Sequence, residues 1–210
     1  MGPGDEMQEP RLVLASGSPR RADLLRQIGL RFEVLVPELD EERLVRSVPA
    51  ASGSPAAIAL LLARAKAREI ASCRADSLIL AADTVVVSGA EEVLGKPADD
   101  ADALRMLCAL SGRTHRVITG TVLLDAAAGT EARAGPTTRV RMRTLPAEVM
   151  AAYVASGEPR GKAGGYAIQG RGALLVSGIR GSFTNVVGLP LEILEDLFGR
   201  LGYSLWQYVL

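Results

Sequence analysis

The sequence contains a single histidine and only two cysteines, which removes several kinds of catalytic site from consideration. One histidine cannot build a histidine-rich zinc site, and the HExxH pattern of zinc peptidases is absent. A Ser-His-Asp triad would need His115 itself, and no GxSxG turn accompanies it. We therefore interpret His115 as structural, and we expect chemistry from carboxylates, lysines, arginines and a hard metal ion.

The two cysteines, Cys73 and Cys108, are too few to suggest a disulfide framework. Both lie in apolar stretches with a helical pattern, where a free cysteine commonly serves as a small core residue. Reduced cysteines fit a reducing compartment, so we expect a cytoplasmic protein.

The chain also lacks net charge, because Lys and Arg together number 24 and Asp and Glu together number 24. A protein that coats nucleic acid is usually basic, so we expect no nucleic-acid partner, although a local basic cluster stays compatible with this composition. The longest apolar run, residues 56–63, is far shorter than the roughly 18 residues of a membrane helix, so we expect no membrane partner. Residues 1–10 show no apolar signal segment, and we expect a disordered tail before a single domain over residues 11–210.

Two helices are predicted by the same signal, a serine followed by a proline. Serine is a favoured N-cap, and proline is favoured at the first helical position. Ser18-Pro19 therefore starts a helix that Gly29 ends, and Ser54-Pro55 starts a long helix that runs to about Ser72. Apolar periodicity predicts further helices over residues 99–110, 146–156 and 189–201.

Apolar runs between turn signals predict the strands. They cover residues 11–16, 32–36, 77–82, 85–87, 93–94, 115–125, 131–144 and 173–179, with Asp83-Thr84 following the end of the strand over 77–82. A turn around Gly129 joins two of them into an antiparallel hairpin, so the sheet should be mixed rather than purely parallel. Residues 37–53 and 157–172 are predicted to be loops. The sequence thus predicts an α/β fold with a mixed, twisted sheet and flanking helices.

The first candidate site is the segment Ser16-Gly17-Ser18-Pro19-Arg20-Arg21, where a strand turns tightly into a helix N-terminus. Exposed amides and the positive end of the helix dipole attract phosphate there, and arginines can bind phosphate oxygens in pairs. The GxxxxGK[ST] pattern of a Walker motif is absent. The alternative is an ordinary capped helix with two solvated arginines.

Three further residues could serve a phosphate site. Asp83 ends an apolar strand, where α/β active sites tend to lie, and with neighbouring acids it could hold Mg²⁺ or Mn²⁺ and orient water. Lys96 is disfavoured from a helical conformation by Pro97, and Lys66 lies in the middle of a predicted helix. The alternatives are a turn aspartate and two solvated surface lysines.

The glycine-rich stretch 157–172 is the fourth candidate. Glycines permit a close backbone approach to a ligand, and Glu158, Lys162, Tyr166 and Gln169 could contact one. A flexible surface loop is the alternative, but an apolar Tyr-Ala-Ile in its middle favours order.

Taken together, these segments resemble one family closely, the Maf nucleotide pyrophosphatases. The resemblance spans about residues 11–198 and includes the helix that carries Lys66. Its other segments are LASGSPRR at 14–21, AADTVV at 81–86, LGKP at 94–97, LSGRTHRVITG at 110–120, YVASGEPRGKAGGYAIQGRG at 153–172 and GSFTNVVGLPL at 181–191. Each segment alone is a weak signal, whereas seven in the family's order are specific.

The resemblance implies an elongated α/β fold with two lobes around a deep cleft, similar to that of inosine triphosphate pyrophosphatase, in a single catalytic domain that is often a homodimer. It implies hydrolysis of a nucleoside triphosphate to the monophosphate and pyrophosphate with Mg²⁺ or Mn²⁺ as cofactor. The stretch KAGGYAIQG implies the branch that acts on dTTP and UTP. The alternative is a non-catalytic nucleotide-binding regulator of cell division, and the presence of both acidic and basic residues favours the enzyme.

The resemblance also implies roles for the acidic residues. Asp83 matches the general-base position. Glu41 best matches the acidic metal-associated position, which Glu42 or Asp40 could take instead. Asp83 and Glu41 could share the metal ion, or one could orient water while the other binds metal, and the sequence leaves both assignments open.

Among the remaining residues, the resemblance assigns Lys66 and Lys96 to the catalytic machinery as phosphate-binding lysines. It implies substrate binding by Ser16, Ser18, Arg20, Arg21, Thr84 and Gln169. Thr84 and Gln169 match positions tied to substrate choice. Two arginines, two lysines and a metal ion form a sensible counter-charge for a triphosphate, which carries about four negative charges near neutral pH.

Overall fold

The structure, a computed structural model, describes residues 10–46, 53–89 and 91–209. The predicted tail at residues 1–10 lies outside these ranges except for Pro10. No helix of the described residues is long and apolar enough to cross a membrane.

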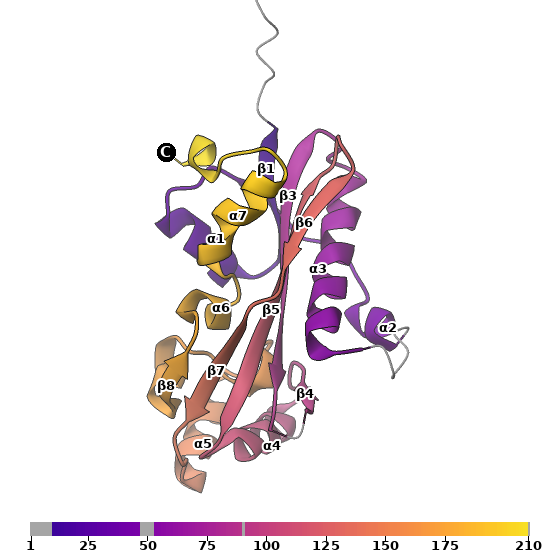
Figure 1. Cartoon of the computed structure of the whole chain (residues 1–210). Coiled ribbons are helices and arrows are strands. Elements are labelled where there is room, and N and C mark those ends of the chain that lie inside the picture. The colour runs from indigo at the N-terminus through magenta and orange to yellow at the C-terminus, as the bar shows by residue number, and fades with distance from the viewer. Residues whose placement is uncertain (1–9, 47–52, 90, 210) are drawn as a thin grey trace, which may run out of the picture.

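Helices and strands are interspersed along the chain (Figure 1). The strands are β1 (Arg11–Ala15), β2 (Glu33–Leu35), β3 (Ser77–Val87), β4 (Val93–Leu94), β5 (Thr114–Asp125), β6 (Thr130–Ala134), β7 (Thr137–Met142) and β8 (Val176–Arg180). The α-helices are α1 (Pro19–Gln27), α2 (Glu41–Arg46), α3 (Pro55–Ala71), α4 (Asp100–Leu110), α5 (Ala147–Ala155), α6 (Phe183–Val187) and α7 (Leu194–Arg200). Short 3-10 helices cover Ala163–Gly165, Gly170–Leu175, Leu191–Ile193 and Leu205–Tyr208.

The strands form one open sheet in the order β2-β1-β3-β5-β7-β8, with β4 added beside β3 and β6 beside β5. The pairs β1–β2 and β1–β3 are parallel, and the pairs of β3 with β5 and of β5 with β6 and β7 are antiparallel. The prediction of a mixed sheet with a hairpin at Gly129 is therefore confirmed. Gly129 has φ +68° and donates its N–H to the carbonyl of Asp125, which closes that turn.

Side chains alternate between the two faces of the strands and so build two cores in the first lobe, which contains β1, β2, α1, α3 and α7. Leu12 and Leu14 of β1 face α1 and α7, where they pack with Leu25 and Phe198. The opposite face of the sheet packs against α3 through small residues such as Ala63 and Ala67. Helices thus cover both faces of this half of the sheet, as Figure 1 shows.

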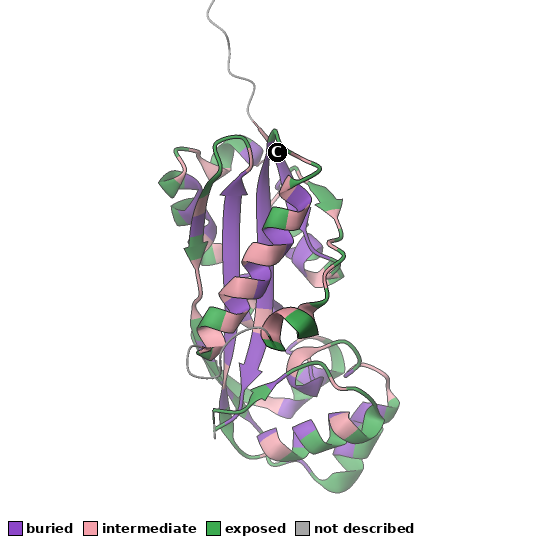
Figure 2. Cartoon of the chain, turned by 90° about the vertical axis from the view of Figure 1, so that its right-hand side faces the viewer, coloured by how far each residue is buried: buried purple, intermediate pink, exposed green. Residues whose placement is uncertain are grey.

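The second lobe contains β7, β8, α4 and α5. Val117 of β5 and Val140 of β7 pack there with Leu107 of α4, Val154 of α5 and Tyr166 of the glycine-rich stretch. β3 and β5 run through both lobes and are buried along nearly all of their length (Figure 2). The two lobes therefore share a pair of strands and are not joined by a linker.

Several predicted boundaries are wrong. Residues 41–46 form helix α2 within a predicted loop, while residues 47–52 of that loop lie outside the described residues. The strand predicted over 131–144 is divided into β6 and β7 at Gly135-Pro136, because proline has no N–H for the ladder. The strand predicted from 173 begins at Val176, after a 3-10 helix. The helix predicted over 189–201 begins only at Leu194, as α7. Helix α6 was not predicted.

The expectation that the cysteines are core residues is also wrong. Cys73 lies just beyond the end of α3, and Cys108 lies in α4, yet both are exposed free thiols. Their apolar neighbours in the sequence belong to the buried faces of these helices, whereas the cysteines do not.

Candidate active site

A gap along one edge of β3 defines the site. β1 pairs with β3 only as far as Ala81, and β4 pairs with it only at Val86 and Val87. Asp83 and Thr84 lie in between, inside β3, so the prediction that Asp83 ends a strand is wrong. At these two residues β3 is paired with β5 on one side, and no described strand pairs with it on the side of the gap. Neighbouring residues of a strand point to opposite faces of the sheet. The side chains of Asp83 and Thr84 therefore lie on opposite faces, and both can be reached from the gap at this edge.

A cavity of about 1010 Å³ opens at this gap, between the two lobes. Its wall comes from the turn after β1, from α2 and α3, from the edge of β3, from the segment after β4 and from the glycine-rich stretch. All the residues to which the family resemblance assigned a role line it: Ser16, Ser18, Arg20, Arg21, Glu41, Lys66, Asp83, Thr84, Lys96 and Gln169. Glu42 also lines the cavity, and Asp40 does not.

Lys66 connects the two predicted catalytic carboxylates. Its Nζ lies 2.6 Å from Oδ1 of Asp83 and 2.7 Å from Oε1 of Glu41. The second oxygen of Glu41 accepts a hydrogen bond from Nζ of Lys96 at 3.1 Å. The side chain of Lys66 is only 9% exposed, and that of Asp83 only 13%. A charged lysine at the middle of a helix is buried here because it has two anionic partners.

The position of Lys66 depends on how closely α3 approaches the sheet. Gly120 of β5 is the direct partner of Asp83 in the antiparallel ladder. A Cβ at Gly120 would lie 2.5 Å from backbone atoms of Ala59 and Leu60, so only glycine allows α3 to rest on β5 at this point. The same helix carries Lys66 two turns later, directly onto Asp83.

The lysines also change the acidity of Glu41. Burial alone would raise the pKa of this carboxyl group, but hydrogen bonds and charges of Lys66 and then of Lys96 outweigh burial and lower the pKa below its ordinary value. Glu41 therefore stays ionised at neutral pH and is available as an oxygen ligand or as a charge partner.

The two arginines of the turn after β1 differ in their surroundings. Arg21 is 8% exposed, and its guanidinium donates hydrogen bonds to three neutral acceptors: Oγ of Ser16 at 3.1 Å, Oγ1 of Thr84 at 3.2 Å and the carbonyl of Gly188 at 2.7 Å. Arg20 is half-buried and has no hydrogen bond or ion pair with any described residue. Neither guanidinium forms an ion pair with a carboxylate of the described residues, although the charges of Asp83 and Glu41 act on Arg21 from a distance, so this end of the cavity offers positive charge to an anion.

The glycine-rich stretch forms part of the cavity wall, and side chains that do not line the cavity hold its conformation. The prediction that Glu158 contacts a ligand is wrong. Its carboxylate instead accepts hydrogen bonds from the backbone N–H groups of Arg171 and Gly172 and from the hydroxyl of Tyr153, so it fixes the loop. The N–H of Gly164 donates to the carbonyl of Gly95, which ties the loop to the segment that carries Lys96.

Two residues of this wall face the cavity. The ring of Tyr166 lines it, and the hydroxyl of Tyr166 lies 2.7 Å from Nε2 of His115. Gln169 also lines it, and its side-chain amide forms no hydrogen bond with any described residue. The amide of Gln169 is thus available to a ligand.

Comparison with known proteins decides the family. The family described as Maf-like protein matches residues 11–201, which is most of the chain and includes every segment of the cavity wall. The chain belongs to the Maf-like family. The resemblance of the seven sequence segments is therefore confirmed.

Curated relatives of this Maf-like chain share close to half of its residues. A dTTP/UTP pyrophosphatase of Moorella thermoacetica is 49% identical over 199 residues, which cover 95% of this chain and 99% of the relative. Proteins of the same name from Pelotomaculum thermopropionicum and Geobacter sulfurreducens are 45% and 46% identical. These alignments cover 92% and 91% of this chain and 97% of each relative.

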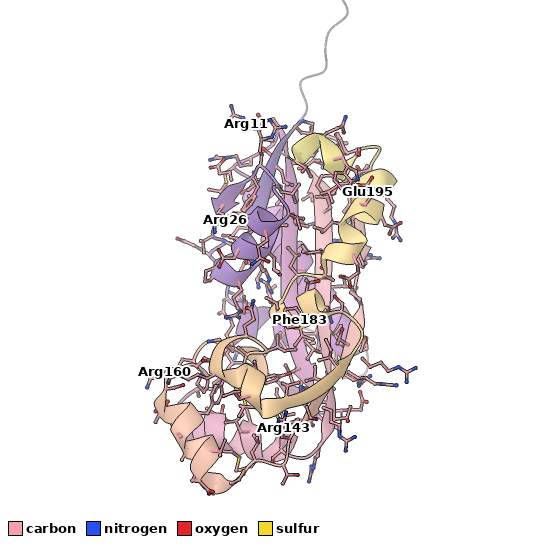
Figure 3. All side chains as sticks on the ribbon, turned by 90° about the vertical axis from the view of Figure 1, so that its left-hand side faces the viewer. Arg11, Arg26, Arg143, Arg160, Phe183 and Glu195 are labelled. Atoms are coloured by element: carbon pink, nitrogen blue, oxygen red, sulfur yellow. The ribbon has the colours of Figure 1, made fainter. Side chains whose placement is uncertain are left out.

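Lys162 lines the cavity, as the glycine-rich stretch predicted. Burial lowers the pKa of its ammonium group, and the charge of Arg20 lowers it further. Two arginines of the cavity, Arg46 of α2 and Arg160, were not predicted as site residues. Figure 3 shows Arg160 at the outer side of the molecule. The glycine density around Arg160 was the available signal for that residue, whereas Arg46 lies in a segment without helix caps or glycines, which gave no signal.

His115 is structural, as its sequence context predicted. It is 2% exposed and packs edge-on against Tyr166 with ring centroids 5.3 Å apart. Burial lowers the pKa of His115 to about 4, so the imidazole is neutral at physiological pH.

Proposed function

We propose that this Maf-like protein hydrolyses dTTP and UTP to the nucleoside monophosphate and pyrophosphate. The observation that carries this proposal is the cavity, in which Arg20, Arg21, Lys66 and Lys96 face the same space as Asp83 and Glu41. The names of the relatives, dTTP/UTP pyrophosphatase, give the substrate class and the reaction. Phosphoryl chemistry depends mainly on positioning and charge stabilisation, which such a set of groups supplies.

A divalent metal ion fits the carboxylates of this site. Asp83 and Glu41 supply hard oxygen ligands, and both already bind a single cation, the ammonium of Lys66. The described residues contain no cluster of three acidic, cysteine or histidine side chains that could hold a metal alone. Mg²⁺ commonly takes one or two carboxylates together with substrate phosphates and water, so we propose that Asp83 and Glu41 hold Mg²⁺ or Mn²⁺ in this way. When bound, the ion would neutralise phosphate charge and polarise water.

The residues of the chain then have separable tasks. Arg20 and Arg21 bind the phosphates, because neither guanidinium is held in an ion pair with a carboxylate. Lys66 and Lys96 turn from the carboxylates to phosphate oxygens once the substrate enters. Asp83 accepts the proton of the attacking water. The water oxygen bonds to the α phosphorus. The bond between the α phosphorus and the oxygen that bridges the α and β phosphates breaks, and pyrophosphate leaves.

The reaction is tested by its products. Incubation of purified protein with dTTP and Mg²⁺ should give dTMP and pyrophosphate in equal amounts, and EDTA should stop the reaction until Mg²⁺ or Mn²⁺ is restored. Orthophosphate with dTDP would show that the wrong bond has been assigned. Tight dTTP binding without any turnover would favour the alternative, a nucleotide-binding regulator.

Base choice is assigned to Gln169. Its free amide offers a donor and an acceptor, which match the carbonyl and imide N–H edge that thymine and uracil share. We expect kcat/KM for dTTP and UTP to exceed that for CTP by tenfold or more, because cytosine has no imide N–H and leaves buried polar groups unpaired. Guanine carries the same carbonyl and N–H edge, so we expect GTP to be rejected by the size of its ring, since the neighbouring glycines let the backbone approach the base. Gln169→Ala should flatten this profile. A profile that is unchanged in the variant would show that Gln169 does not read the base.

We further propose that the protein is a cytoplasmic homodimer that binds neither nucleic acid nor membranes. Support comes from the family resemblance, the balanced composition and the absence of a spanning helix among the described residues. Sedimentation of the purified protein tests the dimer directly.

A further inference from the structure

A chain of buried hydrogen bonds begins behind the cavity wall at Thr84. Thr84 and Thr119 are direct cross-strand partners on β3 and β5, and their hydroxyl oxygens lie 2.9 Å apart. The hydroxyl of Thr119 donates to the backbone carbonyl of Asn185 in α6 at 2.9 Å. Thr119 and Asn185 are both fully buried and do not line the cavity. Neither residue was predicted to belong to the site.

The direction of these hydrogen bonds follows from a count of protons. A threonine hydroxyl has one proton, and that of Thr119 is used on the carbonyl of Asn185. In the contact between the two threonines, Thr84 must therefore be the donor. Thr84 also accepts a hydrogen bond from Nη2 of Arg21. Its single proton is thus committed inward, and towards the cavity Thr84 offers only a lone pair.

Helix α6 holds both ends of this arrangement. The carbonyl of Asn185 accepts a hydrogen bond from the hydroxyl of Thr119. The carbonyl of Gly188, the residue that ends the helix, accepts one from Nε of Arg21 at 2.7 Å. The side-chain amide of Asn185 in turn donates to the carbonyl of Val117 and to Oγ1 of Thr138, at 3.0 and 2.9 Å. Figure 3 shows Phe183, the first residue of α6, midway along the molecule, at the junction of the lobes.

We infer that Thr119 is a positioning residue for substrate binding, which acts through Thr84 on the guanidinium of Arg21. Thr119 accepts the hydrogen bond that the Thr84 hydroxyl donates, so towards Arg21 and the cavity Thr84 can act only as an acceptor. This fixed acceptor keeps the guanidinium of Arg21 directed at the cavity without neutralising its charge. The inference also explains a role for the segment GSFTNVVGLPL. Its helix α6 and the glycine that ends it supply the carbonyl groups to which Thr119 and Arg21 are hydrogen-bonded. The inference rests on the proposed function for its substrate, dTTP.

Removal of the Thr119 hydroxyl should act on substrate binding and not on the fold alone. In Thr119→Val, which is close in shape, the proton of Thr84 is free to turn towards the cavity or Arg21. We expect the affinity for dTTP and kcat/KM to fall about tenfold, with kcat changed less than twofold. Thr119→Ser keeps the hydroxyl and should restore both values.

The chain offers a matched control on the same strand. Thr121 is also fully buried in β5, and its hydroxyl has no hydrogen-bond partner among the described residues. Thr121→Val removes an equivalent buried hydroxyl and should leave dTTP affinity and kcat/KM unchanged. An equal loss in Thr119→Val and Thr121→Val would attribute the effect to β5 packing and overturn the inference.

A double-mutant cycle separates action through Thr84 from an independent effect. In a Thr84→Val background, Thr119→Val should cause no further loss of dTTP affinity, since the group through which it acts is gone. Additive losses would overturn the inference. Affinity is measured by calorimetry with dTTP in EDTA, where no turnover is expected, and kcat/KM is measured with Mg²⁺. A wild type that binds dTTP but does not hydrolyse it would contradict the proposed function, while the binding cycle would still test Thr119.

Discussion

At the scale of single residues, Lys66 occupies the place between Asp83 and Glu41 where a metal ion is proposed to bind. Without such a cation the two carboxylates would face each other in a buried site, which is unfavourable for both charges. The lysine therefore stabilises the site before substrate and metal arrive. In the proposed mechanism, Lys66 leaves the carboxylates as the phosphates arrive.

We predict that Asp83→Asn will lower turnover by about 10²–10⁴-fold, the range for loss of a general base. The change is nearly isosteric, and the amide oxygen can still accept from Lys66, so the fold should persist. Steady-state kinetics and thermal unfolding measure the two effects separately. Asp125→Asn is a suitable control, because Asp125 is a buried carboxylate outside the cavity. Wild-type turnover in Asp83→Asn would contradict the catalytic assignment.

His115 gives a prediction for the dependence of stability on pH. Its pKa is about 4 in the folded protein, compared with an ordinary value of 6.5. Between these values the unfolded chain binds more protons than the folded one, so the stability contributed by neutral His115 is complete above pH 6.5 and is lost as the pH falls towards 4. We expect the free energy of unfolding to decrease by about 2 kcal/mol from this residue between pH 7.5 and pH 5.

Urea unfolding at the two pH values measures this loss. His115→Gln keeps a group that can reach the hydroxyl of Tyr166 but does not titrate, so its stability should change less over the same interval. An equal pH dependence in the two proteins would assign the loss to other groups, such as the carboxylates.

The residues of the site were predicted from the order of seven segments along the sequence, and not from the spacing of residues within one motif. Ser18-Pro19-Arg20-Arg21 and Asp83 each had an ordinary alternative, and only the succession of seven segments favoured a site. The cavity collects those residues, but their individual roles stay predictions. Thr119 and Asn185 lie in two of those segments but were not predicted as site residues, because the hydrogen bond that joins them connects positions far apart in the sequence.

At the scale of helices and strands, the contact of α3 with β5 sets the distance between Lys66 and Asp83. Gly120→Ala would force a Cβ against backbone atoms of Ala59 and Leu60, which cannot rotate away as a side chain can. We predict a loss of about 1–3 kcal/mol in the free energy of unfolding, as for other overpacked sites, and a larger fractional loss of kcat than of dTTP binding. Unfolding and kinetics of the purified variant measure both.

Gly199 in α7 provides the control for Gly120. A Cβ there meets no atom within 4 Å, so Gly199→Ala should be neutral or slightly stabilising. If Gly120→Ala were as stable and active as Gly199→Ala, the close approach of α3 would not be needed.

Elements with strong local signals were predicted well, and those that depend on tertiary contacts were not. The N-cap serine and following proline located the starts of α1 and α3. Helix α2 has no such signal, and no residue of it is fully buried. Helix α6 has only five residues and is held by Asn185 and Gly188 against other elements. The apolar pattern of residues 131–144 continues across Gly135-Pro136, so the sequence did not indicate that two separate strands lie there. β6 pairs with one end of β5, and β7 pairs with the other.

At the scale of the whole molecule, β3 and β5 belong to both lobes. We predict that the lobes unfold together in one transition, because neither can lose its strands without the other. The single tryptophan, Trp206, follows α7 and reports on the first lobe by fluorescence. A dye on the exposed Cys108 of α4, in a Cys73→Ser background, reports on the second. Coincident urea midpoints are expected, and separate midpoints would contradict the prediction of a single domain.

The shared strands also constrain how the protein can move. Asp83 and Thr84 lie on β3 within an extended ladder to β5, whose amides should be among the slowest of the chain to exchange with solvent. Glu41, Lys96 and Gln169 instead come from a short helix, from the segment after a two-residue strand and from the glycine-rich stretch. Rotation of one lobe about the other would have to break the ladder. We therefore expect substrate entry and product release to move these three separate segments and not β3, so that Asp83, the proposed general base, keeps its place throughout the catalytic cycle.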